Sequence, residues 1–201
     1  MDEDARELAL LTAVTTEHFV LQTSRSATVA ESVGRATVFM STLSAALIGL
    51  GFVSSSGHLL KPYLGAVLPT LVITGLLTFA RLVQNMVEDT LGRMRIQRIR
   101  AYYHRQLAGE QKFFADAVAG GDMQAAWPQV GVHPRRGHAL LTTAAFVGAV
   151  NALLLGLGAA LLSGLFGATL GPAIAVGVVV ALVAFAVQIA YINRASVSLG
   201  H

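Results

Sequence analysis

The sequence predicts an all-α membrane protein with four transmembrane helices and helical extensions on the cytoplasmic side. One observation is the composition: 54% of the 201 residues are hydrophobic and 12% are charged, about half the charged share of a typical soluble domain. The other is the presence of four long stretches without Asp, Glu, Lys, Arg or His. Each is close to the roughly 20 apolar residues that a helix needs to cross the hydrocarbon core. Lipid is therefore the expected surrounding of much of the chain.

The four apolar stretches are the expected membrane spans. They cover residues 36–54, 64–80, 139–164 and 171–192. A helix of a soluble core would show a polar face at helical spacing, and these stretches show almost none. Pro69 lies within the second stretch and is expected to kink it, because proline cannot donate the helical hydrogen bond.

The distribution of positive charge predicts the orientation. Of the 14 Lys and Arg residues, only Lys61 lies in a short loop between paired spans; the others lie in the N-terminal segment, the long middle loop or the C-terminal tail. Basic residues collect on the cytoplasmic side of membrane proteins. The expected location is the cell membrane (plasma or inner), with both termini and the long loop in the cytoplasm.

This topology divides the chain into cytoplasmic and membrane segments. The N-terminal segment lacks proline, so we expect it to continue into the first span with little break. It begins acidic, whereas the segment after the second span is basic, which favours antiparallel pairing of two helical arms. The predicted segments are an N-terminal arm (1–35), helices 1 and 2 (36–84), a basic arm and loop (85–138), helices 3 and 4 (139–193) and a tail (194–201).

The basic arm is the strongest concentration of charge in the chain. Its candidate residues for a membrane surface or a partner protein are Arg93, Arg95, Arg98, Arg100 and Arg105. Arginines close to the inner leaflet are attracted by its anionic lipids. Charge on both sides of the arm's apolar stripe also fits packing against another helix. No recognised nucleic-acid-binding module accompanies the patch, so no nucleic-acid partner is expected.

Small residues recur at every fourth position in the apolar stretches. The third stretch has six in succession, from Ala144 to Gly164. Such a pattern lets helix backbones approach closely in lipid, and it fits a contact within one protomer or between protomers of a homo-oligomer. The residues singled out for helix packing are Gly148, Ala152, Gly156, Gly49 and Gly177.

Polar side chains within the spans are the candidates for a pore lining. Asn151, Gln188 and Thr74 are the residues chosen, because polar groups at membrane depth mark solute pathways. The alternative is a contact between helices, by an interhelical hydrogen bond in the case of Asn151, whereas Thr74 can also bond a backbone carbonyl of its own helix. Near the cytoplasmic ends, a second candidate group forms an ionic cluster that either gates the protein or fixes the two arms together. Its members are Glu17, His18, Glu31, Arg35 and Arg81.

Several classes of chemistry find no support in the sequence. Cysteine is absent, which excludes disulfides and thiolate sites. The six histidines are scattered, so no metal site is expected. Phosphate-binding glycine loops and hydrolase motifs are also missing. We therefore expect no cofactor and no enzymatic activity.

Two segments carry a resemblance to known proteins. Residues 16–39, TEHFVLQTSRSATVAESVGRATVF, and residues 81–103, RLVQNMVEDTLGRMRIQRIRAYY, resemble a group of small multi-pass membrane proteins from actinobacteria. That group has no established activity. The resemblance implies a membrane location and transfers no site residue.

The predicted function follows from these features. We expect a homo-oligomeric channel or pore-like protein that is gated from its cytoplasmic helical layer, with the lipid bilayer and further copies of the chain as partners. The alternative is a non-conducting sensor or scaffold that recruits a cytoplasmic protein through the basic arm. A small-solute transporter is a further option, although the spans lack the charge that proton or ion coupling uses.

Overall fold

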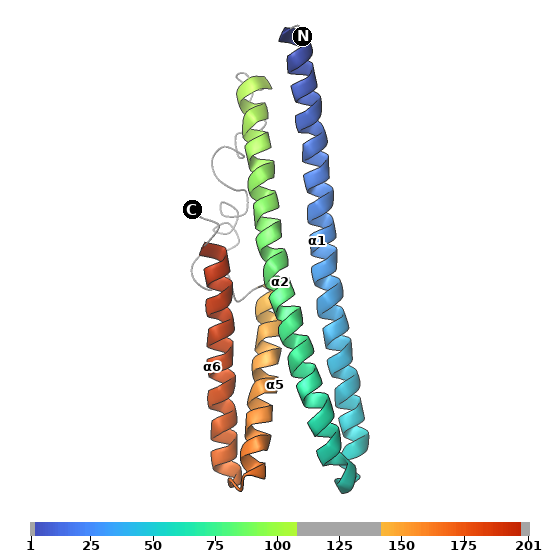
Figure 1. Cartoon of the computed structure of the whole chain (residues 1–201), viewed down its shortest axis with the longest axis vertical. Coiled ribbons are helices and arrows are strands. Elements are labelled where there is room, and N and C mark those ends of the chain that lie inside the picture. The colour runs from blue at the N-terminus through green and yellow to red at the C-terminus, as the bar shows by residue number, and fades with distance from the viewer. Residues whose placement is uncertain (1–2, 108–141, 198–201) are drawn as a thin grey trace, which may run out of the picture. The chain divides into compact units, whose positions relative to one another are not determined.

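The computed structural model describes residues 3–107 and 142–197, and these residues form helices and no strand. The helices are α1 (Glu3–Ser54), α2 (Gly57–Leu107), α5 (Thr143–Leu165) and α6 (Leu170–Val197), as Figure 1 shows. Each is long and apolar enough to cross a membrane. The all-α prediction and the four apolar helices are thus confirmed for the described part of the chain.

The first two helices are much longer than a membrane span. α1 has 52 residues and α2 has 51, so each continues from an apolar stretch into a charged one without a break. α2 remains helical through Pro62 and Pro69. The turn between them is shorter than expected, because helix resumes at Gly57. Lys61, expected in a loop, lies instead near the start of α2.

The second pair of helices is joined by a tight turn. Thr142 caps the start of α5, where its side-chain oxygen accepts a hydrogen bond from the backbone N–H of Ala145 at 3.1 Å. After α5 ends, Gly167 adopts a φ of 89°. This left-handed conformation suits glycine, which has no Cβ, and it reverses the chain. α6 then begins at Leu170.

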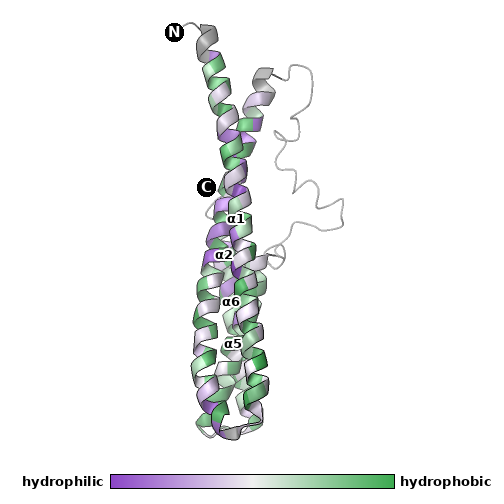
Figure 2. Ribbon diagram, turned by 90° about the vertical axis from the view of Figure 1, so that its right-hand side faces the viewer, coloured by the Kyte–Doolittle hydropathy of each residue, from purple (hydrophilic) through white to green (hydrophobic). Residues whose placement is uncertain are grey.

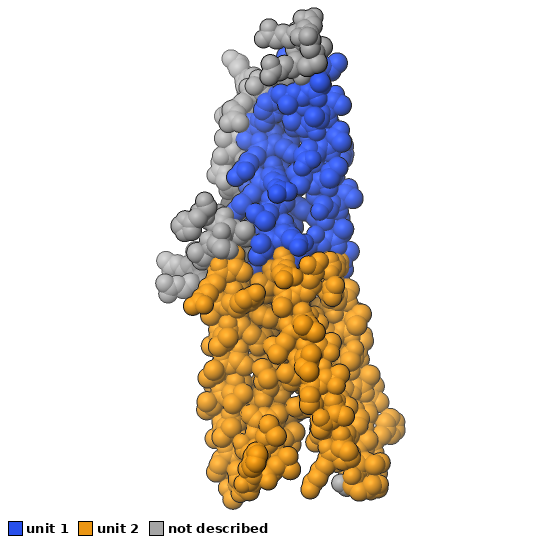
Figure 3. All heavy atoms as spheres, viewed as in Figure 1, with its two compact units in different colours: residues 1–30, 85–138 blue, residues 31–84, 139–201 orange. Residues whose placement is uncertain are grey.

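The chain divides into two compact units, which Figure 3 colours separately. One comprises residues 1–30 and 85–138, and its described part is the charged half of α1 and of α2; we call it the helix-pair unit. The other comprises residues 31–84 and 139–201 and holds the apolar stretches; we call it the four-helix unit.

The four-helix unit has a small core and a broad apolar surface. Phe39, Phe79 and Val147 are buried in the core. Large apolar side chains such as Val38 and Leu182 are exposed, at 67% and 65%, and hydrophobic residues predominate along α5 and α6 in Figure 2. An apolar surface this extensive is typical of contact with lipid or another protein.

Candidate functional site

Two buried amide side chains mark the most unusual place in the four-helix unit. Asn151 of α5 has no solvent exposure, and neither its Nδ2 nor its Oδ1 has a hydrogen-bond partner among residues 3–107 and 142–197. Gln188 of α6 is 6% exposed, and its Oε1 also has no partner. Most buried polar atoms in proteins are hydrogen-bonded, and each that is not costs about 1–3 kcal/mol. These amides therefore need an explanation beyond packing.

Asn151 lies against helices α1 and α2. A Cβ atom added to Gly75 of α2 would overlap the Oδ1 of Asn151 and would lie 2.9 Å from the Phe39 ring of α1. Gly75 is itself buried. Glycine is thus required at this position, because any side chain would displace the amide.

Gln188 of α6 lies against Gly148, about one helical turn before Asn151 on α5. A Cβ added to Gly148 would be 2.9 Å from the Gln188 Oε1 and 3.2 Å from the Phe79 ring of α2. The Phe79 ring also meets Tyr191 of α6, with centroids 6.2 Å apart. We call the two amides and the four residues around them, six in all, the amide site. They are Phe39, Gly75, Phe79, Gly148, Asn151 and Gln188.

The third polar candidate lies beside this site in sequence. Thr74 precedes Gly75 on α2 and is half-buried. Of the six site residues, sequence reasoning selected Gly148, Asn151 and Gln188 and missed Phe39, Gly75 and Phe79. Gly75 follows Thr74 in an otherwise bulky segment, which is a signal for close helix approach; nothing in the sequence distinguishes Phe39 and Phe79 from the other apolar residues.

The ionic cluster of the four-helix unit contains three of the five predicted residues. The Arg35 Nε donates to Glu31 Oε1 at 2.7 Å, and Arg81 of α2 donates to both Glu31 oxygens, at 3.1 and 3.3 Å. These hydrogen bonds, with that from Arg81 the larger, lower the pKa of Glu31 from 4.5 to about 2. Glu17 and His18 belong to the helix-pair unit.

The helix-pair unit has its own ion-pair cluster. Arg25 of α1 contacts Asp89 of α2 at 2.7 Å, and Arg93 contacts the same carboxylate at 2.6 Å. Gly92 leaves room for this contact, since a Cβ there would lie 3.0 Å from the Arg25 Cγ. The charges of this pair are the reverse of those expected. The N-terminal arm, which begins acidic, supplies the cation Arg25, and the basic arm supplies the anion Asp89. Asp89 is the acceptor because it faces Arg25 and also lies one turn before Arg93.

The remaining arginines of the basic arm differ in their surroundings. Arg95 and Arg98 are exposed and form no ion pair within the described residues. Arg100 is half-buried. The side chain of Arg105 lies outside the described residues. Ile96, on the apolar stripe of the same helix, is buried.

The small residues of α5 and α6 meet inside the four-helix unit. A Cβ on Gly156 would lie 2.5 Å from the Gly177 carbonyl oxygen and 2.8 Å from the Ala181 Cβ, so the two backbones touch. Ala152 is buried on the same face of α5. Gly49 of α1 packs under the Tyr63 ring of α2.

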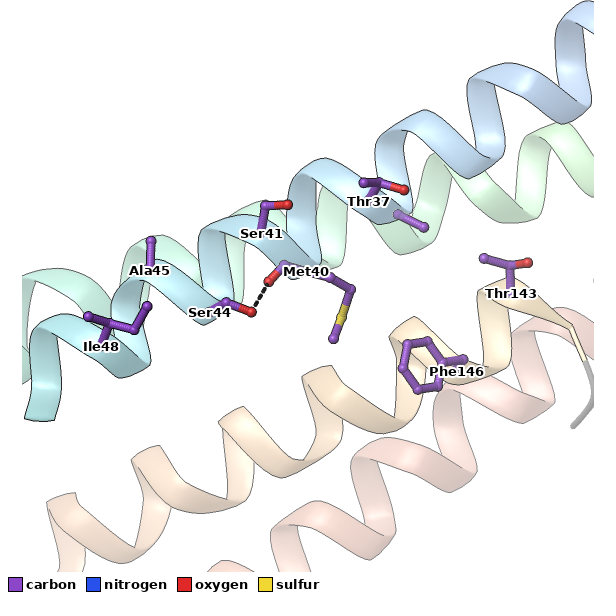
Figure 4. Close-up of a pocket in the computed structure, with 9 residues that line it drawn as sticks. Thr37, Met40, Ser41, Ser44, Ala45, Ile48, Thr143 and Phe146 are labelled. Atoms are coloured by element: carbon purple, nitrogen blue, oxygen red, sulfur yellow. Dashed lines mark hydrogen bonds between the residues drawn. The ribbon is translucent and has the colours of Figure 1, made fainter.

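The small residues of α1 follow a different course. Thr37, Ser41 and Ala45 are exposed and line an open groove of about 630 Å³ between α1 and α5. In Figure 4, Met40 points from α1 toward α5, and the Ser44 hydroxyl is bonded to the Met40 carbonyl. The lining residues are Ala36, Thr37, Met40, Ser41, Ser44, Ala45, Ile48, Thr143 and Phe146.

Comparison with known proteins identifies no relative: no protein-family model matches the chain, and no curated protein or solved structure is detectably similar to it. The resemblance to small actinobacterial membrane proteins stays a prediction. Within the described ranges, 3–107 and 142–197, no group of three or more His, Cys, Asp or Glu side chains is arranged to hold a metal ion.

Proposed function

We propose that the chain is an integral protein of the cell membrane that conducts small polar solutes or ions under the control of its helix-pair unit. Both termini and the helix-pair unit lie on the cytoplasmic side in this proposal, and several copies of the chain assemble together. The support comes from the apolar helices, the amide site and the continuity of α1 and α2.

The observation that carries conduction is the buried, unpartnered Asn151. Its helix contains no charged residue, and a polar group at membrane depth is costly enough that it usually serves a solute pathway. An amide that served only to join two helices would have a hydrogen-bond partner on the neighbouring helix. Asn151 has none.

Control by the helix-pair unit follows from helix continuity. α1 and α2 each run unbroken from the charged stretch into the apolar one, and Asp89 holds Arg25 of α1 and Arg93 of α2 together. In this proposal, a movement of the charged halves is passed along the two continuous helices to Phe39, Gly75 and Phe79. This is the basis for gating from the cytoplasmic layer.

Assembly into homo-oligomers is supported by the exposed membrane half of α1. In the most apolar 18-residue stretch of α1, 11% of the residues are buried, against 44% of the residues in that of α5. Thr37, Ser41 and Ala45 present small side chains at every fourth position on this open surface, the pattern that favours close helix association in lipid.

Flux measurements on purified protein in liposomes and planar bilayers test the proposal. Wild-type protein is expected to pass a small solute or an ion, and Asn151→Leu to reduce the flux while the protein keeps its elution volume and helical content. Asp89→Asn is expected to change the open fraction, because it loosens the helix-pair unit. Membranes that stay tight to every solute and ion over a range of voltage and pH would refute conduction.

The second candidate, a scaffold that recruits a cytoplasmic protein, is favoured by Arg95 and Arg98. Both are exposed and unpaired in the described part of α2, so they are free to bind an acidic partner. In a pull-down from native membranes, Arg95→Glu with Arg98→Glu should lose such a partner. Lys61→Glu, an exposed charge reversal near the opposite end of α2, is the matched control. Equal recovery of bound proteins with all variants would reject this candidate.

A further inference from the structure

The contacts within the four-helix unit group its helices into two hairpins. In the first, the Tyr63 Oη of α2 donates to the Ala46 carbonyl of α1 at 2.7 Å, and Arg81 binds Glu31. In the second, the backbones of α5 and α6 touch at Gly156 and Gly177. Each hairpin is therefore tied internally by strong or close contacts.

The contact between the two hairpins is of another kind. The first hairpin contributes Phe39, Gly75 and Phe79, which have no polar side-chain atom. The second contributes the amides of Asn151 and Gln188, whose Oδ1, Nδ2 and Oε1 atoms are buried without a hydrogen-bond partner in the described ranges. Polar groups of one hairpin thus lie against Gly75 and two aromatic rings of the other, at distances that leave no room for a Cβ on Gly75.

We propose that this contact is the closed state of a path for water and small uncharged polar solutes. Phe39 and Phe79 close the path, and Asn151 and Gln188 bind the solute when the hairpins separate. The inference rests on the proposed function and assigns its conducting path, its gate and its class of solute. The path lies inside one protomer, so the groove beside α1 has no part in it.

Two opposing contributions make such a contact able to open. Burial of the two aromatic rings favours the closed state. Dehydration of the two amides favours the open state, because their hydrogen bonds are restored only when water or a solute reaches them. The hairpins can separate without disrupting either one, since the Tyr63–Ala46 hydrogen bond, the Arg81–Glu31 ion pair and the Gly156–Gly177 backbone contact each lie within one hairpin.

The chemistry of the site indicates the solute. Asn151 and Gln188 each present an amide donor and an amide acceptor, which together suit hydroxyl and amide groups. None of the six residues carries a charge, and selection of ions commonly uses rings of charged side chains or of backbone carbonyls. Water and compounds such as glycerol or urea fit this site.

Thiol labelling tests whether Asn151 reaches water. The chain has no cysteine, so Asn151→Cys is a unique reporter for a membrane-impermeant, hydrophilic thiol reagent, which reacts with the thiolate in water. In the full-length protein in liposomes, labelling is expected to be slow with Phe79 intact and several-fold faster with Phe79→Ala. Phe79→Leu retains more apolar volume than Phe79→Ala, so it should give an intermediate labelling rate. It replaces Phe79→Ala in this test if the alanine variant does not fold.

Leu153→Cys is the matched control. Leu153 lies on the same helix and is 68% exposed on the apolar surface. Labelling of Leu153→Cys should therefore be equally slow in the protein with Phe79 intact and in the Phe79→Ala variant. Asn151→Cys that is labelled at the same rate in all backgrounds, or in none, would overturn the inference.

Solute flux separates this inference from the proposed function. Vesicles with Phe79→Ala should take up glycerol or urea faster than wild type, and addition of Asn151→Leu should cancel the gain. Ion currents without glycerol or urea flux would retain conduction and overturn this path. A labelling change in vesicles that pass nothing would support a hydrated amide site and refute the proposed function.

Discussion

The two hairpins of the four-helix unit are held by different means. α5 and α6 meet backbone to backbone, with the Gly156 carbonyl 2.8 Å from where a Gly177 Cβ would lie. α1 and α2 are joined through side chains: the Tyr63 hydroxyl on the Ala46 carbonyl near their connecting turn, and Arg81 on Glu31 further along. A backbone contact has no freedom to adjust, whereas a side-chain contact can break and re-form.

This difference fits the roles proposed for the hairpins. α5 and α6 carry the amides and need a fixed spacing, because a shift of either helix would misplace Asn151 or Gln188. α1 and α2 carry the charged halves and the aromatic rings, so they are the helices that must move. We therefore expect the α5–α6 contact to be the more sensitive to substitution.

The largest effect is expected from Gly156→Ala. The new Cβ would lie 2.5 Å from the Gly177 carbonyl oxygen and 2.8 Å from Ala181, so one backbone must move, and overpacking of this kind costs about 1–3 kcal/mol. Gly164→Ala is the control, since nothing lies within 4 Å of its Cβ position; there the better helix propensity of alanine contributes alone. Unfolding in detergent should show a lower midpoint for the first variant and an equal or higher one for the second. Equal midpoints would mean that the backbones do not touch.

A smaller effect is expected from Tyr63→Phe. The substitution removes the hydrogen bond to the Ala46 carbonyl and keeps the ring over Gly49, so the free energy of unfolding should fall by about 0.5–1.5 kcal/mol. Tyr191→Phe is the matched control, because Tyr191 is 51% exposed and its hydroxyl has no hydrogen bond within the described residues. The same detergent unfolding assay measures both, and a loss for Tyr191→Phe as large as for Tyr63→Phe would contradict this account.

The extent to which the sequence predicts this structure depends on the range of each contact. Contacts within one helix follow from spacing alone, so the i,i+4 pairs Glu31–Arg35 and Asp89–Arg93 can be predicted from the sequence. The apolar stretches can also be predicted, because a long uncharged run has few alternatives to a membrane-length helix.

Contacts between helices depend on register, which spacing along one helix does not determine. Both α1 and α5 have small residues at every fourth position. In the structure, however, Gly156 is buried against α6, whereas Ser41 and Ala45 face an open groove. Likewise, Arg25 could not be assigned to Asp89 without knowing which turns of α1 and α2 lie side by side. The placement of Asn151 on Gly75 is a further case, because only the helix pairing shows that the amide has no partner.

The smallest effect concerns Glu31 and its dependence on pH. Arg81 and Arg35 lower the pKa of Glu31 from 4.5 to about 2. A carboxylate with a depressed pKa stabilises the fold fully above its unfolded-state pKa, and this contribution is lost as the pH falls toward the folded-state value. The unfolding midpoint of wild type should therefore decrease between about pH 4.5 and pH 2 by more than that of Glu31→Gln. Glu17→Gln, an exposed carboxylate without an ion pair in the described part of α1, should keep the wild-type profile.

At neutral pH, Glu31→Gln should have little effect on stability. The Glu31 and Arg81 side chains are 34% and 36% exposed, and ion pairs in contact with water contribute little. Glu31 stays ionised throughout the physiological range, so the cluster holds α1 to α2 without acting as a pH sensor. If flux through the protein responded to pH between 5 and 8 and Glu31→Gln removed that response, the cluster would be a titratable gate, and the two hairpins would differ in regulation as well as in packing.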